Sequence, residues 1–182
     1  MAKGKYKLLH NEAYVDYEGD EIVEIGKMVD TETSTDAMFI YYDKNLYKNA
    51  GYHMTCYVHE DEEGELPVCM VSDMHRECFF AQRNVFLAMV LHEYGHYLHG
   101  DLKMEGVTNK QIQEERVNCI RENRVMEIEL AADEFAVSHV GKNVFLRSLD
   151  YLIQTRRARN DTGMFMAIKE FELRKKAVQK MK

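Results

Sequence analysis

The pattern of apolar and polar positions changes near the middle of the chain. In the first half, short apolar runs alternate with charged positions at a period of two, which is typical of half-buried β-strands. Four strands are predicted, over residues 21–29, 38–42, 52–58 and 66–71. They are separated by turn-forming or acidic residues at 43–45, 49–51 and 61–64. The first half is therefore expected to form a small sheet.

The second half is predicted to be helical. Residues 80–99 are apolar nearly all round, which is typical of a helix enclosed in the core, and Gly100 is a natural end. Thr108 and Gln111 match a capping box. The segment that they open is predicted to run as one long helix toward Gly141.

Two more helices are expected, over about 143–159 and 163–181, with a turn at 160–162. Strands followed by helices predict an α+β fold. We expect one domain over residues 1–182, consisting of sheet-rich residues 1–79, a pair of helices over 80–140 and C-terminal helices over 143–181.

Pro67 is the single proline of the chain. Proline cannot donate a backbone hydrogen bond to a neighbouring strand, so the strand that it opens is expected at an edge of the sheet. An edge strand beside the apolar helix over residues 80–99 could bind an extended peptide by backbone pairing. An ordinary sheet edge is the alternative.

Composition narrows the classes of partner. The net charge is -7, with acidic residues concentrated over 12–36 and 60–65 and a basic segment over 147–182. An acidic chain of this kind disfavours nucleic acid as a partner. The basic C-terminal helices are expected to be solvated faces.

The cysteines and the apolar runs indicate a compartment. The spacing of the four cysteines matches neither a zinc ribbon nor a compact disulfide scaffold, so reduced thiols are expected. No apolar run approaches the roughly twenty residues that a membrane span requires. The segment after the first lysines is too polar for a signal peptide. These features predict a soluble, cytoplasmic protein without a membrane partner.

Within the apolar helix stands the sequence His92-Glu93-Tyr94-Gly95-His96. Two histidines four positions apart project from one face of a helix, close enough to bind one zinc ion. Glu93 would lie beside water bound to that metal. The motif is short enough to arise by chance, so a metal-free helical protein is the alternative.

Two histidines do not complete a zinc site, and the next long helix offers a third ligand. Glu129 and Asp133 are four positions apart and share a face, between alanines that permit close packing. Glu129 could bind the metal, and Asp133 could accept a hydrogen bond from a ligating histidine. Gly95 costs a helix about 1 kcal/mol relative to alanine. We therefore expect close packing at Gly95, against a strand or the glutamate helix.

These paired motifs resemble those of gluzincin metallopeptidases, in which a later helix supplies a glutamate ligand. They are most similar to the minimal gluzincins and to soluble relatives of CAAX-type membrane proteases, whose glutamate helix reads Glu-x-x-Ala-Asp. The resemblance covers about residues 80–139. It implies a zincin-like fold, with a small sheet packed on an active-site helix and a glutamate-bearing helix. It also implies Zn²⁺ held by His92, His96 and Glu129, with Glu93 as the catalytic carboxylate and Asp133 beside a ligand histidine.

Two departures limit what the resemblance implies. The membrane-spanning helices of the CAAX-type relatives are absent, so a prenylated or intramembrane substrate does not follow. A metzincin is disfavoured because its third histidine would stand where this chain has Leu102. His99 shares a stripe with His92, either as a polar group near the site or as a helix-end residue facing the last carbonyls.

The expected function is zinc-dependent hydrolysis of a peptide or protein substrate, with a zinc-activated water and Glu93 as general base. The tetrahedral intermediate needs a further donor, for which His139 and Tyr151 are the first candidates, followed by Arg156 and Arg157. One alternative is a zinc-binding regulatory protein without turnover. Another is a bacterial or phage regulatory protease, similar to ImmA-type proteins, that acts on one protein partner. The sequence specifies neither the substrate nor the oligomeric state.

Overall fold

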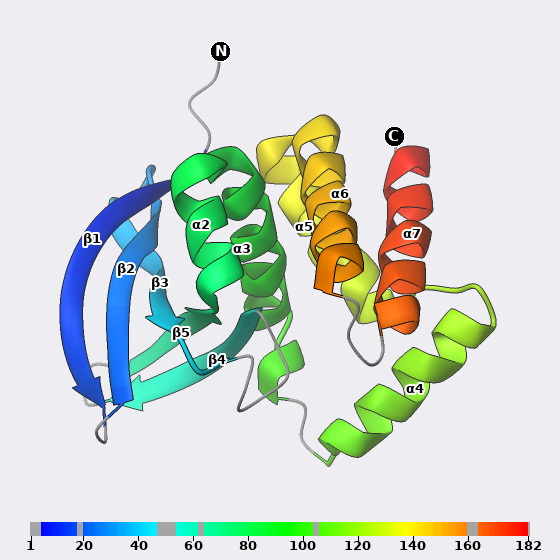
Figure 1. Cartoon of the computed structure of the whole chain (residues 1–182), viewed down its shortest axis with the longest axis horizontal. Helices are drawn as coiled ribbons and strands as arrows, with labels where there is room; N and C mark the ends of the chain where they lie inside the picture. Colours follow the sequence, from blue (N-terminus) through cyan, green and yellow to red (C-terminus); the bar gives the residue numbers. More distant parts are fainter. Residues whose placement is uncertain are drawn as a thin grey trace.

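The computed structural model describes residues 5–17, 20–46, 54–61, 64–103, 106–159 and 164–181, with the backbone alone at 12–17, 20, 21, 61, 103 and 159. Within these residues the chain has an α+β fold, with a five-stranded mixed sheet and six α-helices (Figure 1). The strands are β1 (Tyr6–Tyr17), β2 (Asp20–Asp30), β3 (Thr35–Asp43), β4 (Met54–Asp61) and β5 (Gly64–Val71). The helices are α2 (Asp73–Ala81), α3 (Arg83–Leu98), α4 (Asn109–Arg121), α5 (Glu127–Val140), α6 (Lys142–Arg159) and α7 (Met164–Lys180), with a 3₁₀ turn, η1 (Asp101–Lys103).

The strands lie in the order β1-β2-β3-β5-β4. Neighbouring strands are antiparallel, except β3 and β5, which pair in parallel with Phe39 opposite Val68. The strand β4 therefore forms one edge of the sheet and β1 the other. Among the described residues, this order places β4, not the strand that contains proline, at an edge of the sheet.

The predicted edge position of Pro67 is thus wrong. Pro67 belongs to β5, which lies between β3 and β4. Pairing with β3 begins at Val68, one residue after the proline, so the missing amide lies before the part of β5 that has partners on both sides.

The four predicted strands correspond to β2, β3, β4 and β5, although residues 52 and 53 of the third prediction lie outside the described residues. Of the predicted turns, residues 44 and 45 form one, whereas 49–51, 62–63 and 160–162 fall outside the described part. The first strand, β1, was not predicted. Its apolar residues are grouped and do not alternate with polar ones, since Leu9 directly follows Leu8 and Ala13, Tyr14 and Val15 are consecutive, so a period of two is weak.

The helical half differs from the prediction at two places. The short helix α2 precedes α3, where only one helix was expected. The predicted single helix up to Gly141 consists of two helices, α4 and α5. The break follows Glu122, where Asn123 adopts a left-handed backbone with φ 57°, a conformation that asparagine tolerates better than most residues. The capping box of Thr108 and Gln111 is present at the start of α4.

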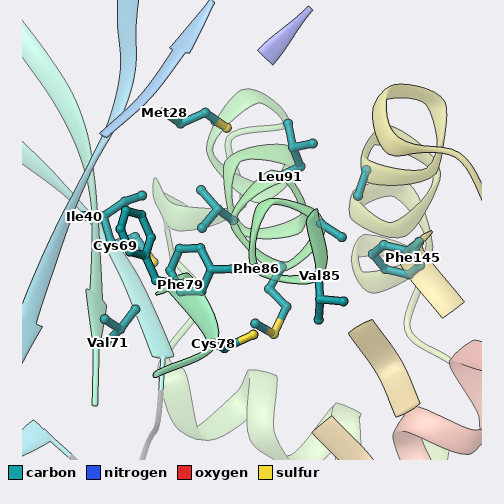
Figure 2. Packing of buried hydrophobic residues seen from close by; sticks show 14 of the residues in the cluster. Met28, Ile40, Cys69, Val71, Cys78, Phe79, Val85, Phe86, Leu91 and Phe145 are labelled. Atoms are coloured by element: carbon teal, nitrogen blue, oxygen red, sulfur yellow. The ribbon is translucent and has the colours of Figure 1, made fainter. Parts of the chain in front are cut away.

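The main core lies between the sheet and the helices α2 and α3. Figure 2 shows Phe79 of α2 next to side chains of the sheet, such as Ile40, with Phe86 of α3 pointing toward it. Phe145 lies on the far side of α3 and connects this core to α6. The helix α3 is therefore covered by the sheet on one side and by helices on the other, which explains why it is apolar nearly all round.

The elements follow one another in layers. In Figure 1 the sheet is followed by α2 and α3, then by α5 and α6, and then by α7, while α4 extends away from the other helices. Among the described residues, none of the helices combines the length and apolarity that crossing a membrane requires. The layering places α3 and α5 side by side and α7 against α5.

Gly26 of β2 lies where a larger residue would disturb the fold. A Cβ atom at this position would lie 2.2 Å from the carbonyl oxygen of Leu9 and 2.9 Å from a ring carbon of Phe79. We predict that Gly26→Ala lowers the free energy of unfolding by about 3 kcal/mol, because the overpacked backbone must shift. Thermal and urea unfolding would measure the loss. The exposed control Lys7→Ala on β1 should stay within about 0.5 kcal/mol of the parent protein; equal stability of both variants would contradict the prediction.

Candidate metal centre

The helix α3 presents two imidazoles on one face. His92 is buried and His96 is half-buried, and their Nε2 atoms lie 3.2 Å apart. Residues four positions apart lie one above the other on a helix, which accounts for the closeness of the two rings. The two Nε2 atoms therefore face a common point.

Helix α5 brings a carboxylate to the same place. Glu129 is buried, and its Oε2 lies 3.3 Å from Nε2 of His92. The approach is made possible by Gly95, since a Cβ atom there would lie only 3.1 Å from the Cα of Ala132. The expected close packing at Gly95 is therefore present, and its partner is the glutamate helix.

The donor atoms fit a small cation. Suitable ligand atoms of His92, His96 and Glu129 all lie within 4.8 Å of one another. In a tetrahedral zinc site with bonds of about 2.0 to 2.1 Å, two ligand atoms are about 3.3 to 3.4 Å apart. The separations of 3.2 and 3.3 Å are close to this spacing. The Oε2 atom of Glu129 is buried and has charged neighbours, with Nη1 of Arg174 at 3.0 Å, but accepts no well-aligned hydrogen bond from the described residues.

Two acidic side chains orient the imidazoles. Oδ1 of Asp133 lies 2.9 Å from Nδ1 of His92, and Oδ2 of Asp101 lies 2.9 Å from Nδ1 of His96. A carboxylate on the outer nitrogen fixes the ring and leaves Nε2 as the donor toward a metal. The first contact joins the pair of residues expected from the sequence, and the second was not predicted.

Arg174 of α7 reaches the same cluster from the opposite side. Its Nε donates a 3.0 Å hydrogen bond to Asp133, and its Nη2 also contacts that carboxylate. The Nη1 atom lies 3.0 Å from Oε2 of Glu129, and Nη2 lies 3.0 Å from Nδ1 and 3.2 Å from Nε2 of His92. A single buried guanidinium group thus touches three of the expected site residues.

A second arginine belongs to the network. Nε of Arg116 donates to both carboxylate oxygens of Glu170, at 2.7 and 2.9 Å, and its Nη2 lies 3.8 Å from Oε1 of Glu129. The network thus has two guanidinium groups, Arg116 and Arg174, and three carboxylates, Glu129, Asp133 and Glu170. With the imidazole of His92 neutral, as metal binding requires, these five groups carry one more negative than positive charge.

The buried charges shift one another's pKa values. Burial raises the pKa of Glu129, but Arg174 and His92 outweigh it, so the pKa lies well below its usual range. The pKa of Asp133 is lowered in the same way. Burial and the charge of Arg174 lower the pKa of His92, but Asp133 and Glu129 outweigh them and raise it to about 9. A metal ion at this cluster therefore competes with a proton for His92.

The cluster opens into a pocket of about 360 Å³. The side chain of Glu93 lines it next to His92 and His96, and the edge strand β4 supplies one wall. Burial and the charge of Glu93 raise the pKa of Cys56 on that strand, which keeps its thiol protonated. The pocket therefore combines the metal-ligating side chains, an additional carboxylate and a strand edge.

The candidates for an additional donor lie at different places. The ring of His139 packs on Phe135 and Tyr6, away from the pocket. The hydroxyl of Tyr151 donates to the carbonyl of Met74 and is likewise not among the groups that line the pocket. Arg157 pairs with Glu172, and Arg156 is the one of the four candidates that lines the pocket.

Four contributors to the network were missed from the sequence, Asp101, Arg116, Glu170 and Arg174, although Asp101 and Arg174 left a signal. Asp101 follows His96 by five positions, just after the glycine that ends the helix. Arg174 lies on the buried stripe of α7, with Phe171 three positions before it and Val178 four after. An arginine on an apolar stripe needs a buried acid as partner. Arg116 offers no comparable signal, because α4 is largely exposed.

Comparisons with known proteins add no family to these observations. No protein-family model, curated protein or solved structure matches the chain. The chemistry of the site must therefore be argued from the residues that the fold brings together.

We predict that Gly95→Leu disturbs both folding and the metal centre. The added side chain would push α5 away at Ala132, so the free energy of unfolding should fall by about 3 kcal/mol and the protein should retain less zinc. The control Asn84→Leu places the same side chain at an exposed position of α3. An unchanged melting temperature and zinc content in Gly95→Leu would refute close packing as the reason for this glycine.

Proposed function

We propose that this chain is a zinc-dependent metallopeptidase of the gluzincin type, with a zincin-like arrangement of sheet, active-site helix and glutamate helix. The observation that carries the proposal is the convergence of His92, His96 and Glu129 within 4.8 Å, with Glu93 lining the same pocket. A structural metal site needs no additional carboxylate in its pocket, whereas hydrolysis requires a base.

Zinc held by these three side chains would supply a Lewis acid and lower the pKa of its water toward neutrality. The chain's own residues would do the remaining work. Glu93 would take a proton from the attacking water and return it to the leaving amine. Asp133 and Asp101 would hold the two imidazoles so that each keeps Nε2 toward the metal.

A peptide could bind along β4. This strand is an edge of the sheet, and its residues Met54, Thr55 and Cys56 line the pocket. An extended chain can pair with the unpaired side of such an edge and place a peptide bond near the site. We therefore propose β4, and not the strand that contains Pro67, as the edge strand that binds an extended peptide.

Zinc content tests the metal centre directly. The parent protein should contain close to one zinc ion per chain by elemental mass spectrometry, and Glu129→Ala should lose most of it because a three-ligand site becomes a two-ligand site. Glu127→Ala, an exposed change two residues earlier on α5, should retain the metal. Absence of zinc from the parent protein after incubation with the metal would leave the motif a coincidence.

Glu93→Gln separates catalysis from metal binding. Glutamine keeps the size of the side chain but cannot accept the proton, so the rate of peptide hydrolysis should fall by about 10² to 10⁴-fold. Zinc content should be unchanged. Glu134→Gln, an exposed change on α5, serves as the control and should keep full activity. A metal-loaded Glu93→Gln protein with normal turnover would overturn the role of Glu93. Zinc binding without hydrolysis by the parent protein would favour a zinc-binding regulatory protein.

A further inference from the structure

The guanidinium group of Arg174 occupies the centre of the buried charge network. Its side chain is 4% exposed and lies between the carboxylates of Asp133 and Glu129, which are 0% and 9% exposed. Buried carboxylates are costly unless a positive partner is close. Among the described residues, Arg174 is the arginine that contacts both of these carboxylates.

The same guanidinium group lies beside the atoms that a metal would need. Nη1 is 3.0 Å from Oε2 of Glu129, and Nη2 is 3.2 Å from Nε2 of His92. Glu129 and His92 both belong to the cluster that could hold a metal ion. Two positive groups around one carboxylate oxygen repel each other strongly in a buried place. A bound metal ion and the guanidinium group of Arg174 would therefore compete for the carboxylate of Glu129.

Arg116 does not take over this role. Its strong contacts are with Glu170, and it approaches Glu129 only at 3.8 Å through the other carboxylate oxygen. No contact joins Arg116 to Asp133 among the described residues. Removal of Arg174 would therefore leave Asp133 without a guanidinium partner and Glu129 with a distant one.

We propose that Arg174 is a positioning residue that acts as an internal counter-ion of the metal centre. It holds Asp133 and Glu129 in place before the metal binds, and it weakens metal binding because the metal must compete with it for Glu129. The helix α7 thereby sets the metal affinity of a site whose ligands lie on α3 and α5. This inference rests on the proposed metal centre and concerns its regulation.

The test measures zinc binding and stability in Arg174→Met, which removes the charge but keeps a long side chain. The metal-free variant should melt at a lower temperature than the parent protein. Its zinc dissociation constant, measured by competition with a chelator, should be at least tenfold lower, and zinc should raise its melting temperature by more. A side chain that only supported the fold would lower stability without tightening zinc binding.

Two further variants act as controls. Arg174→Lys keeps a positive charge and should bind zinc with an affinity close to that of the parent protein. Arg157→Met removes an exposed positive charge that pairs with Glu172 away from the pocket, and it should leave zinc affinity unchanged. A tightening in Arg157→Met equal to that in Arg174→Met would overturn the proposal, because the effect would then reflect overall charge.

The outcomes separate the two proposals. If the parent protein binds no zinc, the proposed metal centre itself is wrong. A parent protein that binds one zinc ion, together with an Arg174→Met variant that binds it equally or more weakly, would overturn the role of Arg174 alone. If Arg174→Met folds only when zinc is present, the metal has replaced the lost counter-ion, as proposed. Failure to fold even with zinc would contradict it, because Arg174 would then be needed equally in both states.

Discussion

The close approach of α3 and α5 at Gly95 is the constraint on which the rest of the site depends. With a glycine facing Ala132, the two helices come near enough for His92 on one and Glu129 on the other to lie 3.3 Å apart. A wider spacing would leave an isolated imidazole pair and an isolated acid. The cost of a glycine inside a helix is thus offset by contacts that neither helix could make alone.

Burying polar groups at a helix contact creates an electrostatic problem, and the fold solves it with side chains from other elements. Asp101 comes from the turn after α3, Arg116 from α4, and Glu170 and Arg174 from α7. Their charges alternate around the cluster, so each buried group has an opposite charge near it. When His92 is neutral, the carboxylates outnumber the guanidinium groups, which favours a cation over an additional anion.

The sequence predicted the parts of the structure that follow local rules. Four strands, the apolar helix with the histidines and the two C-terminal helices have clear periodicity, and the spacing of His92 and His96 fixes their common face. The strand β1 was missed because its apolar residues do not alternate regularly with polar ones, and the break at Asn123 because a single left-handed residue leaves a weak pattern. The edge position of Pro67 was wrong because strand order depends on contacts far apart in the sequence. Arg174 was missed for the same reason, since its partners lie on other helices.

The span of the contacts made by Arg174 has a consequence for cooperativity. Its hydrogen bonds reach across 41 residues to Asp133 and 82 residues to His92. Local opening of α7 would therefore expose the buried carboxylates and weaken α5 and α3 together, instead of fraying one helix by itself. Amides in these three helices should exchange with solvent as one unit. The contacts of Arg174 thus couple the local unfolding of three helices that are far apart in the sequence.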